Sequence, residues 1–412
     1  MKNILLLTSV YPVEDFSKDS TPVVHYFAKE WVLQGYNVQV IHNHKYYPRI
    51  VYFLINLFKN IISKYYKFIF NTKGQIEERH YTLDNVKVHR LPILKRFPKS
   101  LYTQKRQKRQ LEKIIRLVES QHFSPDVIIG HWPNPQLFLV SELAKIYRVP
   151  ACMVMHTDVE TIDKMYGKKA KEMIDTIDIW GFRSVEIKNR FESEYGKVNK
   201  SFLCYSGIPE RNTKPPQRTF ENGIKKFLFV GFLIPRKHPE TLVKAVNNAF
   251  PGENFHITFV GEGREKRNIE SLAGRLGIKE KVSLPGRLSR EEVFEMMKDS
   301  DCFIMVSKPE TFGLVYLEAM SMGCITIGSK GEGIDGVIRH GENGFLSKAG
   351  DHGELAELLR KISGLSANEL LTLSNNAIHT ASELTDGKVA KNYIESVKAV
   401  KSFQEYEEPA EV

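Results

Sequence analysis

Residues 301–328 read DCFIMVSKPETFGLVYLEAMSMGCITIG, and their pattern decides the fold. The apolar run Asp301–Ser307 predicts a strand, and the stretch Lys308–Thr311 predicts a loop after it. Gly313 begins a mostly apolar segment that predicts a helix, and Cys324–Gly328 predicts the next strand. A strand, a helix and a second strand in this order are typical of parallel sheets with right-handed crossovers.

The same alternation extends through the rest of the chain. In the second half we expect strands at Lys226–Gly231, His256–Gly261 and Lys281–Leu284, with helices at Pro239–Asn248, Arg264–Leu276 and Arg290–Lys298. In the first half we expect strands at Ile4–Thr8, Asn37–His42, Val86–Leu91, Asp126–Gly130 and Val149–Met155, with helices at Pro22–Gln34 and Pro135–Tyr147. The pattern therefore predicts an α/β protein with two doubly wound parallel-sheet domains in tandem.

A change of composition places the boundary between the two domains. Residues 209–222 contain Pro215-Pro216 with Asn212 and Thr213, which is typical of a linker. We therefore expect an N-terminal domain over 1–208 and a C-terminal domain over 223–385. Residues 386–412 should form a helix, which packs back on the N-terminal domain, and an acidic tail.

Length and composition exclude several classes of protein. The 412 residues suit two hydrophobic cores rather than one. The N-terminus lacks the apolar stretch of a signal peptide, and no apolar run reaches the ~18 residues of a spanning helix. The cysteines lie far apart in apolar runs, which indicates buried thiols in a reducing cytoplasm; they are Cys152, Cys204, Cys302 and Cys324.

Chemically useful residues follow the predicted strands of the second domain. Ligands of open α/β sheets bind outside the carboxyl ends of the strands. Arg236 and Lys237 come just before a predicted helix, where cations and backbone N–H groups suit a diphosphate, although a solvated basic turn has the same composition. Gly231 and Gly263 allow backbone to approach a ligand closely, or they only form tight turns.

Two carboxylates flank the start of the helix in the opening segment. Glu310 precedes the helix and Glu318 lies within it, so the two side chains need not share a face. Carboxylates accept hydroxyl donors well, and the free N–H groups at Phe312–Leu314 can meet phosphate. Helix capping and surface exposure are the plain alternatives, but Glu318 lies among apolar residues and would need a partner if buried. The glycine-rich loop Ser329–Gly336 also follows a strand.

Histidines end two strands of the first domain. His131 follows Asp126–Gly130, and His156 follows Val149–Met155 with Asp158 two residues later. Both are placed to face a cleft if the two domains oppose each other, and a structural role is the alternative for each. Asp299-Ser300-Asp301 precedes a strand, at the end opposite these sites. We therefore read it as a turn and expect no metal site.

The first half of the chain contains a segment rich in basic and aromatic residues. The net charge is +10, and no aspartate or glutamate occurs from Trp31 to Ile76. Residues 45–73 mix lysine and arginine with tyrosine, phenylalanine and leucine, which suits a helix in the headgroup layer of an anionic membrane. Residues 95–116 add further cations. A core helix with solvated lysines is the alternative, and nucleic acid is disfavoured because no binding motif accompanies the charge.

The ordered motifs of the second half resemble a known family. They are Gly231-x4-Arg236-Lys237, Val260-Gly261-x-Gly263, Glu310-x7-Glu318 with Phe312-Gly313-Leu314, and Asn343-Gly344-Phe345. The set resembles the retaining GT-B glycosyltransferases of the family-4 type, also described as glycosyl transferases group 1. The resemblance spans roughly residues 225–365 closely, and it implies two Rossmann-like domains that face an interdomain cleft.

The resemblance also implies a role for each matching residue. Arg236 and Lys237 would hold the donor diphosphate, Glu318 the ribose hydroxyls, and Glu310 the transferred sugar. The backbone near Gly313, Leu314 and Val315 would cover the phosphates, and the nucleobase would lie near Arg287. His131 would lie near the reacting sugar in an acceptor-binding N-terminal domain, with His156 and Asp158 on the acceptor side.

Two positions depart from the family pattern. Phe232 stands where many relatives carry an arginine, and Arg236 is the residue that could supply this charge. The loop Val10–Thr21 has no glycine, whereas many relatives have a glycine-rich loop there.

The predicted function is transfer of a sugar from a nucleotide sugar, UDP-linked in our prediction, to a glycan or lipid-linked acceptor with retention of configuration. We expect no cofactor, and we expect the protein in the cytoplasm, peripheral to the inner face of the membrane. Two alternatives stay open from the sequence: a nucleotide-sugar epimerase of similar fold, and a non-catalytic membrane-associated scaffold.

Overall fold

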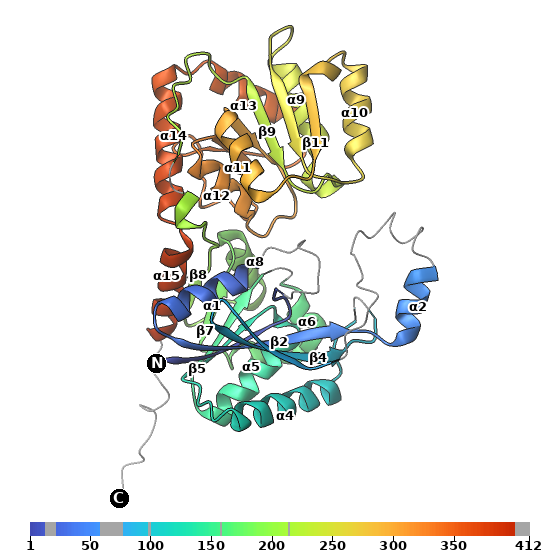
Figure 1. Cartoon of the computed structure of the whole chain (residues 1–412), viewed down its shortest axis with the longest axis vertical. Coiled ribbons are helices and arrows are strands. Elements are labelled where there is room, and N and C mark those ends of the chain that lie inside the picture. The colour runs from blue at the N-terminus through green and yellow to red at the C-terminus, as the bar shows by residue number, and fades with distance from the viewer. Residues whose placement is uncertain (13–21, 58–76, 98–99, 157–158, 213–214, 400–412) are drawn as a thin grey trace, which may run out of the picture. The chain divides into compact units, whose positions relative to one another are not determined.

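The computed structural model describes residues 1–12, 22–57, 77–97, 100–156, 159–212 and 215–399. The chain divides into two compact units. The N-terminal unit comprises Met1–Phe182, Asn189–Cys204 and the chain from Ala390, and the C-terminal unit comprises Arg183–Lys188 and Tyr205–Val389. Both units are α/β layers built around one sheet, as the alternation of apolar runs predicts (Figure 1).

The N-terminal unit contains an eight-stranded sheet in the order β3-β4-β2-β1-β5-β6-β7-β8. All neighbours are parallel except β3 and β4. Its central strands are buried on both faces, which is why they read as unbroken apolar runs. The strands are β1 (Asn3–Thr8), β2 (Asn37–Tyr46), β3 (Arg79–Leu83), β4 (Val86–Leu94), β5 (Val127–His131), β6 (Ala151–Met155), β7 (Ile179–Phe182) and β8 (Ser201–Leu203).

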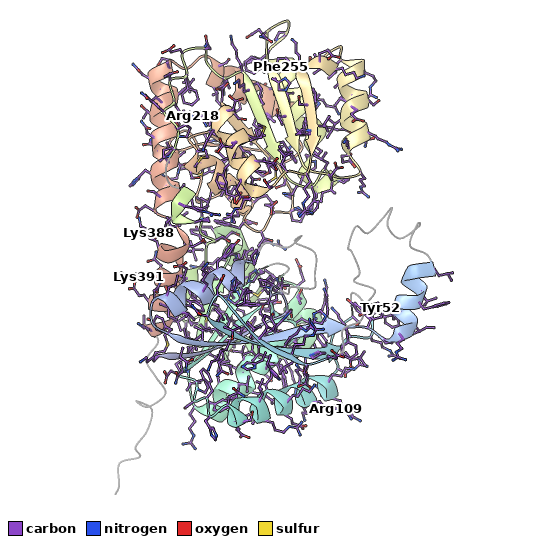
Figure 2. All side chains as sticks on the ribbon, viewed as in Figure 1. Tyr52, Arg109, Arg218, Phe255, Lys388 and Lys391 are labelled. Carbon is purple, nitrogen blue, oxygen red and sulfur yellow. The ribbon has the colours of Figure 1, made fainter. Side chains whose placement is uncertain are left out.

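Helices connect these strands. They are α1 (Val23–Leu33), α2 (Arg49–Leu57), α4 (Gln104–Ser120), α5 (Pro133–Tyr147), α6 (Thr161–Tyr166), the 3₁₀ turn η1 (Gly167–Lys169), α7 (Ala170–Ile174) and α8 (Val185–Tyr195). In α4, Ile114 and Val118 are buried, whereas Arg109 points away from the unit (Figure 2). The basic run within 95–116 is therefore in large part the solvated face of a packed amphipathic helix.

The C-terminal unit contains a six-stranded, all-parallel sheet in the order β11-β10-β9-β12-β13-β14. Numbered within the unit, this order is the 3-2-1-4-5-6 of doubly wound nucleotide-binding sheets. The order of successive strands reverses between β9 and β12, so ligands are expected at the carboxyl ends of these two strands. The strands are β9 (Lys226–Val230), β10 (His256–Val260), β11 (Val282–Gly286), β12 (Cys302–Ile304), β13 (Ile325–Ser329) and β14 (Phe345–Ser347).

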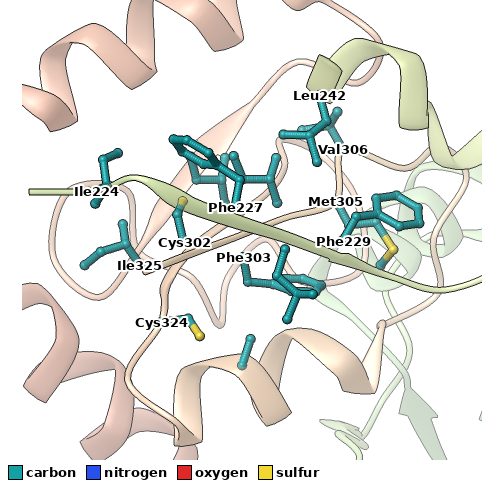
Figure 3. Packing of buried hydrophobic residues seen from close by; sticks show 14 of the residues in the cluster. Ile224, Phe227, Phe229, Leu242, Cys302, Phe303, Met305, Val306, Cys324 and Ile325 are labelled. Carbon is teal, nitrogen blue, oxygen red and sulfur yellow. The ribbon is translucent and has the colours of Figure 1, made fainter. Parts of the chain in front are cut away.

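The helices of this unit cover both faces of the sheet. They are α9 (Pro239–Ala249), α10 (Lys266–Arg275), α11 (Arg290–Asp299), α12 (Leu314–Ser321), α13 (His352–Ser363), α14 (Ala367–Ser382) and the start of α15 (Asp386–Lys398), with 3₁₀ turns η2 (Glu210–Asn212), η3 (Pro235–Lys237) and η4 (Lys279–Lys281). The core between them includes Phe227 and Phe303 (Figure 3). All four cysteines are free and buried, as predicted.

The division into units departs from the predicted domains at two places. Arg183 groups with the C-terminal unit, and its guanidinium lies 5.4 Å from the ring centroid of Phe312. Arg218, inside the predicted linker, donates to the backbone carbonyls of Met297 and Met322, so this stretch packs into the C-terminal unit (Figure 2). Residues 213–214 and the tail 400–412 lie outside the described residues.

The last helix, α15, belongs in its second half to the N-terminal unit. The indole Nε1 of Trp31 donates to the carbonyl of Ala390 at 2.8 Å, and the ring of Tyr393 packs edge-on against Trp31. Burial of these aromatic rings stabilises the return of the chain to the first sheet. The prediction for 386–412 placed a helix on this domain, and the structure puts Ala390–Lys398 there.

The local structure departs from the sequence prediction at two places. The sequence did not predict β3, an edge strand of mostly polar side chains that pairs antiparallel with β4 through the turn Asp84-Asn85. The basic segment is also not one helix from residue 45, because β2 continues to Tyr46 and α2 covers only Arg49–Leu57. Residues 58–76 of that segment lie outside the described residues.

Candidate active site

Two loops meet beyond the carboxyl ends of β9 and β12. Arg236 and Lys237 lie in η3, which follows β9, and Glu310 follows β12. The amide of Lys308 donates to the carbonyl of Arg236 at 2.7 Å, and the Arg236 guanidinium donates to the carbonyl of Pro309 at 2.8 Å. These bonds hold both loops together at the carboxyl ends of β9 and β12, between which the strand order reverses. Ligands of such sheets bind at this edge.

Glu310 is a largely buried carboxylate, with 12% of its side chain exposed, and donors surround it. Its Oε2 lies 3.3 Å from Lys237 Nζ and 3.5 Å from Arg236 Nη1. The hydroxyl of Ser307 donates to the same oxygen at 3.1 Å. Burial alone would raise the pKa of Glu310, but the two cations and the hydrogen bonds outweigh it and hold that pKa below its usual value. Glu310 is therefore an anion at neutral pH and not a general acid.

A second carboxylate, Glu332, supports the backbone of this loop. Its Oε2 accepts from the amide of Glu310 at 2.7 Å, and the amide of Gly333 donates to the carbonyl of Glu310 at 2.9 Å. A Cβ on Gly333 would lie 2.3 Å from the backbone of Thr311, so only glycine permits this approach. Burial raises the pKa of Glu332. The loop Ser329–Gly336 was expected to lie at a ligand edge, but the role of Glu332 was not predicted.

The helix α12 begins beside Glu310. Gly313 is its N-cap with φ of 77°, and no side chain caps the first turn. A Cβ at Gly313 would lie 2.4 Å from the ring of Tyr316, which requires glycine. The N–H groups at the start of an uncapped helix are donors for an anion. The ring of Phe312 is buried against Tyr205, so this residue offers its backbone rather than its side chain.

Glu318 lies in the second turn of α12, buried and paired. Arg290, the first residue of α11, donates to Glu318 Oε1 from Nε at 2.9 Å and from Nη2 at 2.6 Å. Burial raises the pKa of Glu318, and the adjacent guanidinium opposes this rise. The partner that a buried Glu318 would need is thus Arg290. Arg287, near which the nucleobase was expected, lies three residues before Arg290 and is exposed.

The two predicted glycines have packing roles in the loops after β9 and β10. A Cβ on Gly263 would lie 2.0 Å from the carbonyl oxygen of Leu233, so Gly263 lets the two loops touch. Gly231 has φ of 149°, and its missing Cβ would lie 3.3 Å from Lys237 Nζ. Phe232 follows with an exposed ring. The cation beside this loop is therefore provided by Lys237, with Arg236 adjacent.

In the N-terminal unit, His131 and His156 form a hydrogen-bonded pair. Nδ1 of His131 lies 2.8 Å from Nε2 of His156, and Nε2 of His131 lies 3.3 Å from the hydroxyl of Tyr393. His131 is fully buried, and Trp132 stacks on His156 with ring centroids 3.8 Å apart. The ring of His131 is therefore enclosed within the N-terminal unit, between His156 and Tyr393. Tyr393 was not predicted, and Asp158 lies outside the described residues.

Neither a candidate metal site nor a candidate membrane span occurs among the described residues. These residues contain no group of three or more histidine, cysteine, aspartate or glutamate side chains that could hold a metal ion. Asp301, of the Asp-x-Asp sequence, accepts from the amides of Lys225 and Lys226 and so fixes the start of β9. In the same described part of the chain, none of the helices has both the length and the apolar character to cross a bilayer.

Comparisons with known proteins relate the chain to glycosyltransferases. The family model described as "Glycosyl transferases group 1" matches residues 210–380. An uncharacterised glycosyltransferase of Methanocaldococcus jannaschii is 27% identical over 342 residues, which are 80% of this chain and 90% of the relative. The sulfoquinovosyl transferase of Arabidopsis thaliana is 27% identical over 298 residues, which are 67% of this chain and 57% of that protein.

The fold itself is shared with solved structures. Anabaena HepE in complex with UDP superposes with a TM-score of 0.68 at 17% identity, covering 97% of this chain and all of that one. The chain is thus a glycosyltransferase with the GT-B architecture of two parallel-sheet domains. Within that class, residues 210–380 are similar to the group 1 glycosyltransferases, and they include Arg236, Lys237, Glu310 and Glu318.

Proposed function

We propose that this enzyme transfers a sugar from a nucleoside diphosphate sugar to a hydroxyl of a lipid-linked or growing glycan, with retention of configuration. One observation carries the donor part of the proposal. Lys237 and Glu310 form a largely buried pair where the strand order of the second sheet reverses. The pair lies beside the uncapped start of α12. A cation next to helix N–H groups suits a diphosphate. Retention is inferred from the resemblance to the family-4 enzymes.

Each residue of the donor site has a separate chemical task in this proposal. Lys237, Arg236 and the amides at the start of α12 stabilise the negative charge that develops on the departing diphosphate. Glu310, held as an anion, accepts hydrogen bonds from hydroxyls of the transferred sugar. Glu318, whose Oε1 accepts two bonds from Arg290, accepts hydrogen bonds from the ribose hydroxyls.

The nucleotide is proposed to be uridine diphosphate. Anabaena HepE, which shares the fold, has been solved with UDP and with UDP-glucose. The acceptor is proposed to be a glycan of the cell surface that is built on a lipid at the cytoplasmic face of the membrane. The basic and aromatic segment supports this acceptor class, and the N-terminal unit with His156 would receive it.

Thermal unfolding with nucleotides tests the donor assignment. Ligand at about 100 times its Kd stabilises the folded state by about 2.7 kcal/mol, which raises Tm by about 5–11 °C for a domain of 150–250 residues. We expect this shift with UDP and UDP-sugars, smaller shifts with GDP and ADP, and loss of the shift in Lys237→Met. Lys226→Met, which removes an exposed lysine at the opposite end of β9, serves as control. No shift with any of the three nucleotides would exclude the proposed donor.

A further inference from the structure

The helix α2 carries an apolar stripe that faces solvent. Four side chains form it, with exposed fractions of 61% for Ile50, 61% for Phe53, 45% for Leu54 and 64% for Leu57. At about 100° per residue these positions fall within one arc of roughly 100° on the helix surface. Isolated exposed hydrophobic residues are common, but a contiguous stripe on one helix marks an interaction surface.

The opposite side of α2 fixes the helix to its unit. Val51 is buried, and the hydroxyl of Tyr52 accepts from the amide of Tyr47 at 3.2 Å. The rings of Tyr47 and Tyr52 also pack edge-to-face, with centroids 5.9 Å apart. Tyr52 labels this side in Figure 2, where α2 stands at the rim of the N-terminal unit beyond the end of β2. The exposed stripe therefore belongs to a helix that is held in place by its other face.

Cations lie at the start of α2 and at the adjoining ends of β2 and β4. Arg49 begins α2, Lys45 lies near the end of β2, and Lys95 and Arg96 follow β4. The amide of Lys95 donates to the carbonyl of Tyr46 at 2.8 Å, so the ends of both strands lie together. Burial, followed by the charge of Lys45, lowers the pKa of Lys95 to about 8. An anion beside the two ammonium groups would relieve their repulsion.

The remaining features of the patch match a bilayer surface better than a protein. The sequence has no aspartate or glutamate from Trp31 to Ile76 that could neutralise these cations. Phe97, next to Arg96, adds another large exposed side chain, with 56% of its surface accessible. Apolar side chains in the acyl boundary with cations at the phosphates are the pattern of helices that lie in a membrane interface.

We propose that the stripe of α2 and the cations Lys45, Arg49, Lys95 and Arg96 dock the enzyme onto an anionic lipid bilayer. The inference deepens the proposed function, on which it rests for the lipid-linked acceptor, because it places the N-terminal unit where such an acceptor lies. Docking itself needs no glycosyl transfer. The phosphates of anionic lipids bind the cations, and the side chains of Phe53, Leu54 and Leu57 enter the boundary between headgroups and acyl chains.

Sedimentation of the full-length protein with vesicles tests the docking surface. The probes are phosphatidylcholine vesicles with and without phosphatidylglycerol, each at low and at high salt. We expect binding to the anionic vesicles only, and weaker binding at high salt because the attraction is screened. No binding to the anionic vesicles at low salt would overturn the proposal.

Matched variants separate the apolar and the charged parts. Phe53→Ser with Leu57→Ser should lower vesicle partitioning at least tenfold, whereas Leu33→Ser with Ile146→Ser, which changes two exposed hydrophobic residues elsewhere on the same unit, should not. Arg49→Gln with Arg96→Gln should lower it by about fivefold per cation. Lys168→Gln with Lys169→Gln, which removes two exposed cations of η1, is the corresponding control.

Two further measurements decide between explanations of a failure. If the protein is a dimer, and Phe53→Ser with Leu57→Ser converts it into a monomer without changing vesicle binding, then α2 is a dimer interface. The proposal would then be wrong. The UDP thermal shift is measured on the same variants. An intact UDP shift without vesicle binding would contradict the docking surface and support the donor site. Vesicle binding without a UDP shift would support the docking surface and contradict the donor site.

Discussion

Replacing Lys237 with methionine should destabilise the C-terminal unit by a predictable amount. Lys237 Nζ lies 3.3 Å from Glu310 Oε2, and the side chains are only 10% and 12% exposed. At this distance Coulomb attraction amounts to about 5 kcal/mol with an effective dielectric constant of about 20. Removing one partner of a buried pair costs about 3–5 kcal/mol, since the other charge stays buried. Tm should fall by about 6–20 °C at 2–4 °C per kcal/mol.

The pH dependence of this loss identifies its cause. In the wild type the pKa of Glu310 is lowered, so its stabilisation is present above the ordinary carboxyl pKa and is lost as pH falls through the folded value. In Lys237→Met the burial of Glu310 is less opposed, so its pKa should rise above the ordinary value. The folded state of the variant is then destabilised at neutral pH, and this destabilisation decreases as pH falls and Glu310 is protonated. The difference in Tm should therefore be largest near about pH 7.5 and smaller near about pH 5.

A matched control uses an exposed ion pair of the same unit. Lys226 Nζ lies 2.7 Å from Asp299, but both side chains are more than half exposed. Such pairs contribute about 0–1 kcal/mol, so Lys226→Met should change Tm by less than about 4 °C. Thermal unfolding of the three proteins by circular dichroism measures both effects. A Tm of Lys237→Met within about 3 °C of the wild type, or a difference that does not narrow at low pH, would refute the proposed coupling.

Three other predictions follow from single contacts. Glu318→Gln should weaken UDP binding by about 10–100-fold in calorimetry, because a hydrogen bond to a charged acceptor is lost; unchanged affinity would contradict its ribose role. Arg218→Leu should lower the free energy of unfolding by about 2–4 kcal/mol in urea, because three backbone carbonyls lose the donor they share; a loss below about 1 kcal/mol would show that water replaces it. Tyr393→Phe should cost only about 1 kcal/mol in the same assay, because it removes one hydroxyl from His131, and a much larger loss would mean that the ring is displaced.

The fold and the donor loops could be predicted because their signals are local. A strand buried on both faces, such as Ile4–Leu7, must be apolar throughout, and the positions after each strand stand out as glycine or charge. In doubly wound sheets the carboxyl ends of strands meet at one edge, so Lys237 and Glu310 were expected at the same site. In the structure, Lys237 Nζ lies 3.3 Å from Glu310 Oε2, in agreement with this expectation.

The partners of the site residues could not be predicted, because they come from distant crossovers. Arg290 opens α11 behind a Ser289 cap, and in sequence it reads as an ordinary first-turn residue of that helix. Only the packing of α11 against α12 brings it to Glu318. Tyr393 lies 262 residues from His131, and its contact depends on how α15 returns to the first sheet. β3 was missed because an edge strand exposed to water lacks an apolar run.

The charges of the donor site explain how it can be stable before a donor binds and still receive one. Arg236, Lys237 and Arg290 face two buried carboxylates, Glu310 and Glu318, so the set carries one net positive charge. An ammonium has three donors, and two of those on Lys237 point to Glu310 Oε2 and to the sulfur of Met305 at 3.0 Å. Sulfur is a weak acceptor, so the proposed diphosphate can take that direction and the third without breaking the bond to Glu310. In the proposed complex the ion pair is therefore extended by the donor rather than replaced by it, and the carboxylate that stabilises Lys237 in the fold is also the one that faces the sugar.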